Sequence, residues 1–74
     1  MSSTQIAEYT AILKQSGPWW IGWIEEVPGV NCQEPTREEL IASLEEALRE
    51  ALEMNRQEAR AAAGSDYAEI KIAV

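Results

Sequence analysis

The sequence has no histidine and a single cysteine, Cys32, among its 74 residues. A lone thiol cannot form a disulfide within the chain, and without a second thiol or an imidazole no zinc site can be assembled. A chain this short buries only roughly 60% of its unfolded surface, and such cores seldom supply more than about 3 to 5 kcal/mol. We therefore expect no metal or cofactor, and a homo-oligomer (a dimer or tetramer) or a permanent partner.

Long apolar runs and clustered basic residues are also missing. No stretch of about 18 apolar residues exists, and residues 1–4 lack the features of a secretory signal, which predicts a cytoplasmic protein with no membrane contact. Six basic against 13 acidic residues give a net charge of −7. Because phosphate binding needs clustered cations, we expect no direct nucleic-acid binding. The negative charge fits a basic protein partner better. An equally good explanation of this charge is that it only keeps the chain soluble.

Four segments have the alternation or the composition of β-strands: residues 5–14, 19–27, 30–33 and 67–74. Gly17-Pro18 provides turn chemistry between the first two segments, and Pro28-Gly29 does so before the third.

A long amphipathic helix is predicted over residues 37–63, between Thr36 and Gly64. Thr36 and Glu39 have the capping-box spacing, in which the Glu39 carboxylate reaches back to the amide of residue 36. An apolar stripe follows at three- and four-residue spacing: Leu40, Ile41, Leu44, Ala47, Leu48, Ala51 and Leu52. A helix of about 40 Å exceeds the length of such strands, so the part after Met54 should overhang the sheet, fray or pack on a neighbouring subunit.

These elements predict one α+β domain over residues 1–74 with the order βββαβ. Three strands are expected to be antiparallel, and the fourth to lie parallel to the first after a right-handed crossover. The helix should cover one face of the sheet.

The second strand is apolar on both faces, which carry Trp19, Ile21 and Trp23 on one side and Trp20, Gly22 and Ile24 on the other. Because one helix covers one face, either Trp20 or the pair Trp19 and Trp23 should lie on the other, where aromatic residues anchor interfaces. Any two of these indoles are equally well explained as core residues. Stacking on nucleic-acid bases would need flanking cations that the segment lacks.

The remaining polar residues give little support to a catalytic site, and we expect that the protein is not an enzyme. Glu25 and Glu26 are adjacent in a strand and point to opposite faces, so they cannot act on one bond. Cys32 has no histidine to activate it, and there is no glycine-rich phosphate loop. We assign Glu25 and Glu26 to the same partner-binding or oligomer interface as the tryptophans.

The chain resembles the N-terminal domain of HicB-type antitoxins over residues 5 to about 55. The resemblance rests on the run from Tyr9 to Lys14, the glycine turn, the aromatic second strand and two further runs. These are Glu26-Val27-Pro28-Gly29-Val30 and Pro35-Thr36-Arg37-Glu38-Glu39-Leu40.

The family has a partial ribonuclease H-like fold without the nuclease carboxylates, and its members cover the catalytic surface of HicA, a small basic ribonuclease toxin. The resemblance implies an antitoxin-like protein that binds and occludes such a toxin. The alternative is an oligomeric interaction or structural module of the same fold without a toxin partner. Many members add a C-terminal DNA-binding domain, which is not expected here because the sequence stops at Val74. The sequence departs from the family pattern at two places. Glu26 stands where the family usually has an aspartate before the Pro-Gly turn, and Glu34-Pro35 stands where the family usually has a glycine before the threonine that caps the helix.

Overall fold

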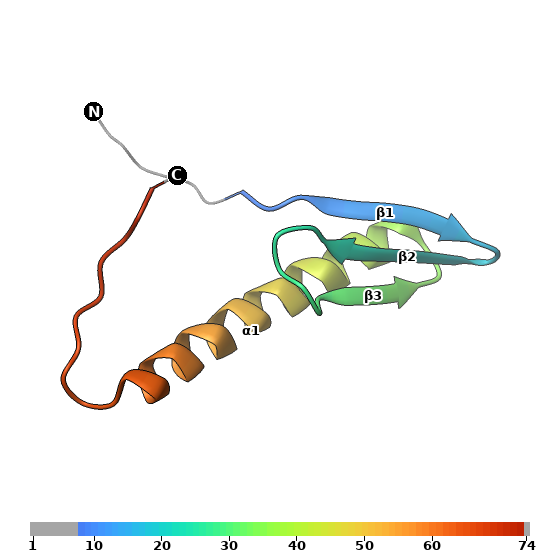
Figure 1. The fold of residues 1–74 in the computed structure, drawn as a ribbon. Coiled ribbons are helices and arrows are strands. Elements are labelled where there is room, and N and C mark those ends of the chain that lie inside the picture. The colour runs from blue at the N-terminus through green and yellow to red at the C-terminus, as the bar shows by residue number, and fades with distance from the viewer. Residues whose placement is uncertain (1–7, 74) are drawn as a thin grey trace.

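The computed structural model describes residues 8–73, which form a three-stranded antiparallel sheet and one long helix (Figure 1). The strands are β1 (Ala11–Ser16), β2 (Trp19–Ile24) and β3 (Asn31–Glu34), in the spatial order β1-β2-β3, and the helix is α1 (Arg37–Ala63). The helix crosses one face of the sheet and continues beyond it (Figure 1). The predicted α+β class, the three antiparallel strands and the single long helix are confirmed.

Tight turns set the register of the sheet. Ser16 pairs with Trp19, so a two-residue loop joins β1 to β2. Gly17 opens this loop at φ +61°, a conformation that residues with a side chain rarely adopt. The register follows from this loop and pairs Ile12 with Trp23 and Leu13 with Gly22.

The helix begins and ends at the predicted residues. The Thr36 hydroxyl accepts from the Glu39 amide at 3.1 Å, as expected for a capping residue. The Glu39 carboxylate differs from the prediction: it accepts from the Thr36 hydroxyl at 2.9 Å, and no bond to the Thr36 amide is seen. At the other end, the Gly64 N–H donates to the Arg60 carbonyl at 3.2 Å, with φ +86° at Gly64. Within residues 8–73, no helix has both the length and the apolar composition needed to cross a membrane.

The core lies between the sheet and the first half of the helix. Its buried side chains among the described residues are Ile24, Val27, Val30, Leu40 and Leu44. The later apolar residues of the stripe, such as Leu48 and Leu52, are only partly buried against this cluster. The second half of α1 therefore overhangs the sheet, as the length argument predicted.

The predicted strand boundaries need correction. The first strand runs over Ala11–Ser16 and not over 5–14; residues 8–10 are outside it, and 5–7 lie outside the described residues. The second strand ends at Ile24 rather than at residue 27. The third strand is shifted by one residue, to Asn31–Glu34. The second strand is shorter because the chain turns after Ile24 and brings Val27 into the core.

The described part of the predicted fourth strand, residues 67–73, is not paired with the sheet in this molecule. It leaves the far end of α1 and runs apart from β1 (Figure 1). Because α1 continues well past the sheet, this segment starts at a distance from the edge that it was predicted to join. Ile70 and Ile72 are consequently 81% and 78% exposed. Val74 lies outside the described residues.

Candidate interaction surface

The two faces of β2 have different environments. On one face, Ile24 is buried and Gly22 lies directly beneath two leucines of α1. Trp20 shares this face and packs against the core. Alternation places Trp19 and Trp23 on the opposite face, where they are 43% and 40% exposed. The structure thus selects the second of the two arrangements predicted for the tryptophans, with the pair Trp19 and Trp23 facing away from the helix.

Neighbouring strands complete this second surface, which we call the outer sheet face. Its residues are Ile12, Lys14, Ser16, Trp19, Ile21, Trp23, Asn31 and Gln33. In the register, Trp23 lies between Ile12 and Asn31, and Ile21 lies between Lys14 and Gln33. The apolar residues of β2 therefore form the middle row of this face, with Ile12 beside Trp23 and polar side chains at the other flanking positions. α1 covers only the other face of the sheet (Figure 1).

Glu25 and Glu26 occupy the end of the β1–β2 hairpin and are not brought together as a pair. The Glu25 N–H donates to the Thr10 carbonyl at 2.9 Å, which extends the register by one residue. The Glu26 carboxylate accepts from the Thr10 N–H at 2.7 Å. This backbone hydrogen bond holds the pKa of Glu26 below its ordinary value of 4.5. Glu26 therefore has a structural contact that closes the hairpin.

The Glu26 contact predicts a pH dependence of stability. A carboxyl whose pKa is lower in the folded chain stabilises it above the unfolded value, and this contribution is lost as the pH falls through the folded value. We expect Glu26→Gln to lower the thermal midpoint slightly at about pH 6 and to have less effect at about pH 3. Circular dichroism melting of both proteins at the two pH values measures this. Glu25→Gln, which leaves the Thr10 contact intact, is the control; an equal, pH-independent loss in both variants would contradict the assignment.

The other candidate groups do not assemble a reactive site. Cys32 is half-buried on the helix side of β3, where burial, and secondarily the negative charge of Glu34, raises the pKa of its thiol. The protonated thiol is a poor nucleophile. Glu34 itself accepts a hydrogen bond from the Ser43 hydroxyl at 2.6 Å. Over residues 8–73, no three potential metal ligands come together.

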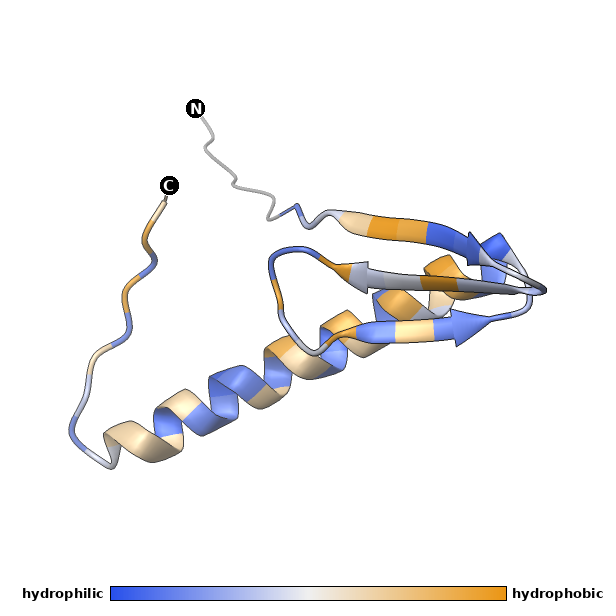
Figure 2. Ribbon diagram, turned by 45° about the vertical axis from the view of Figure 1, so that its right-hand side comes forward, coloured by the Kyte–Doolittle hydropathy of each residue, from blue (hydrophilic) through white to orange (hydrophobic). Residues whose placement is uncertain are grey.

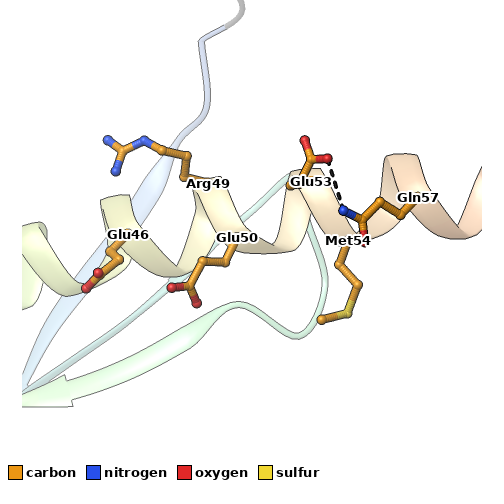
Figure 3. A pocket seen from close by; sticks show the side chains of 6 residues that line it. All are labelled: Glu46, Arg49, Glu50, Glu53, Met54 and Gln57. Atoms are coloured by element: carbon orange, nitrogen blue, oxygen red, sulfur yellow. Dashed lines mark hydrogen bonds between the residues drawn. The ribbon is translucent and has the colours of Figure 1, made fainter.

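A shallow depression on α1 is built from side chains of that helix alone, most of them charged (Figure 3). Its lining residues are Glu46, Arg49, Glu50, Glu53, Met54 and Gln57. Gln57 donates to the Glu53 carboxylate at 3.3 Å, an exposed contact within one helix. Among the described residues no second element closes this depression, so it lacks the enclosed shape of a ligand site.

Sequence reasoning placed Ile21 on the same face as Trp19 and Trp23, but it did not assign Ile12 to this surface. The signal was present in the Gly17-Pro18 turn, because a two-residue hairpin loop fixes the register of the strands that flank it. That register places Ile12 beside Trp23 and thereby enlarges the apolar area.

Comparison of the chain with known protein families, with characterised proteins and with solved structures finds no match.

Proposed function

We propose that this chain is a cytoplasmic, non-catalytic binding module that docks a basic protein on its outer sheet face. The proposed partner is a HicA-type ribonuclease, which a HicB-like antitoxin would occlude. The observation that carries the proposal is the position of Trp19 and Trp23, which are about two-fifths exposed on a face that α1 does not cover. Tryptophan is enriched among the residues that dominate binding energies, and contiguous exposed apolar surface marks interaction sites.

Charge supports a basic partner. The chain carries a net charge of −7, and its field accelerates encounter with a cationic protein. A ribonuclease needs cationic surface to hold RNA phosphates, and a protein that covers this surface must compete with RNA. The lone, half-buried Cys32 fits a reducing compartment. Its protonated thiol and the occupied Glu26 carboxylate support a role that involves no chemistry by this chain.

The outer sheet face is tested by binding to a short basic protein, to be sought in the reading frames beside this gene. We expect Trp19→Ala and Trp23→Ala each to weaken the complex by about 2 kcal/mol or more, roughly 30-fold in Kd, because both are large, exposed aromatic side chains of this face. Isothermal titration calorimetry measures the loss, and circular dichroism checks that the variants fold.

Tyr67→Ala is the matched control, because Tyr67 is a comparably exposed aromatic residue that lies on the C-terminal segment. It should bind like the unmodified chain. Unchanged affinity in both tryptophan variants would contradict docking on this face. A basic neighbour whose RNA cleavage is unaffected by an excess of this chain would contradict the antitoxin role.

A second function is favoured by the exposed apolar C-terminal segment: an oligomeric interaction or structural module of the same fold. It predicts self-association with no effect on ribonuclease activity. Ile70 and Ile72 are more exposed than either outer-face tryptophan, and this supports self-association through a different part of the chain from the outer sheet face. An RNA-cleavage assay with the basic neighbour therefore separates the two functions.

A further inference from the structure

Within residues 8–73, strand β1 forms one edge of the sheet and pairs with β2 alone. The Glu25 N–H bonds to the Thr10 carbonyl, which identifies the residues of this strand whose backbone groups face β2. In an antiparallel pair this orientation alternates, so the N–H and C=O groups of Ala11, Leu13 and Gln15 point away from β2. The edge therefore offers three donors and three acceptors to a further strand.

An apolar recess of about 120 Å³ lies beside this edge, between β1 and α1. It is lined by Tyr9, Ala11, Ile24, Ile41, Leu44, Glu45 and Leu48. Shallower depressions continue from it along the same flank of the helix, past Leu52 to Ala59. A strand bonded to β1 directs every second side chain toward the helix, and hence into this recess. The edge thus has both the backbone groups and the apolar space for a fourth strand.

The C-terminal segment, residues 67–73, has the matching pattern. Ala68, Ile70 and Ile72 alternate with Glu69 and Lys71, as the hydropathy colouring shows (Figure 2). The two isoleucines are about four-fifths exposed. The ion pair between Arg60 and Glu69, at 3.3 Å, joins the segment to the end of α1. Exposed pairs of this kind are weak, so this contact does not prevent the segment from binding elsewhere.

The recess lies beyond the reach of the segment of the same chain while α1 is intact. Leu44 is about 28 Å from Ala63 along a helix that rises 1.5 Å per residue. A strand that returns from Tyr67 at about 3.3 Å per residue covers only about 20 Å by Ala73. Ile72 would stop near the level of Leu52, outside the recess. A second copy of the chain is not limited in this way.

We propose that residues 67–73 of one copy add to the β1 edge of a second copy as its fourth strand, with Ile70 and Ile72 in the recess. Addition of a strand to an exposed edge is an established mode of recognition. Reciprocal exchange closes both edges in a two-fold dimer. The dimer leaves the outer sheet face free, so it does not depend on the proposed basic partner.

The test is the solution mass of the full chain and of the double variant Ile70→Lys and Ile72→Lys. Sedimentation equilibrium at micromolar concentration should give a dimer for the unmodified chain. The double variant should dissociate at least about 100-fold more readily, because two side chains that fill the recess become charged. Both isoleucines are exposed within one molecule, so the monomer should keep its helical circular dichroism spectrum. Met54→Lys, the same type of change at an exposed position of α1, should leave the dimer intact.

A mixing experiment shows which chain supplies the strand. One chain carries Ala11→Cys, the other carries Ile72→Cys, and both carry Cys32→Ser. Oxidation of the mixture should give a disulfide-linked heterodimer. An unmodified chain that is monomeric, a double lysine variant that stays dimeric, or a mixture that gives no disulfide-linked heterodimer would each overturn the proposal.

Discussion

Truncation of Leu40 to alanine is expected to unfold most of the chain at 25 °C. Leu40 is completely buried, and in the part of the chain that the structure describes only a handful of other side chains form the core around it. Leucine-to-alanine changes at such sites cost about 2 to 5 kcal/mol, because the lost contacts leave a cavity. A core of this size supplies no more than about 3 to 5 kcal/mol in total. Urea denaturation followed by circular dichroism should therefore show a very early transition or none.

Leu52→Ala is the matched control for this experiment, because it removes the same atoms from a partly buried position on the same helix. Its urea midpoint should fall much less. All proteins must be compared at one concentration, since self-association adds stability by mass action. Equal losses in the two variants would contradict the concentration of the core at the first half of α1.

The helix could be predicted to the residue because its signals are local. The Thr36 hydroxyl and the positive φ of Gly64 act within one turn of the ends that they define. The apolar spacing identified the face that packs on the sheet, and Leu40 and Leu44 are the buried residues of that face. The exception was the Glu39 carboxylate, which bonds to a hydroxyl that rotates freely toward it.

The strand limits could not be predicted in the same way, because pairing decides them. The alternation of residues 5–14 does not show where a partner strand begins, and pairing starts at Ala11. The alternation of residues 67–74 is clean, yet the described part of it has no partner within this molecule. Alternation therefore predicted the potential of this segment to form a strand, and the overhang of α1 explains why it is unpaired here.

The sequence predicted the candidate surface only as two alternatives, with either Trp20 or the pair Trp19 and Trp23 on the uncovered face. The composition of β2 required an apolar face beyond the helix, and the position of Gly22 decided which face it is. α1 lies against Gly22, so Trp20 shares the covered side and Trp19 and Trp23 lie on the other. In the sequence, Gly22 indicated only a strand position without a side chain. In the structure, this missing side chain allows α1 to lie close to the sheet.

Replacement of Gly22 by valine is accordingly expected to destabilise the fold by about 3 kcal/mol or more, the upper end for an overpacked core. A Cβ atom at this position would lie 2.7 Å from the Ile12 carbonyl oxygen. It would also lie 3.0 Å from Leu44 Cδ1 and 3.1 Å from Leu40 Cδ2. The carbonyl belongs to the β1–β2 ladder and cannot shift without disturbing the backbone pairing, and the two leucines would have to leave their buried positions.

Urea titrations of Gly22→Ala and Gly22→Val should show midpoints that decrease in that order. Gln33→Val is the control, because it introduces the same side chain on the outer sheet face, where β-branched residues suit an exposed strand. A Gly22→Val protein with the midpoint of the unmodified chain would mean that α1 does not pack directly on this glycine. The assignment of Trp19 and Trp23 to the uncovered face, and the docking surface built on it, would then lose their basis.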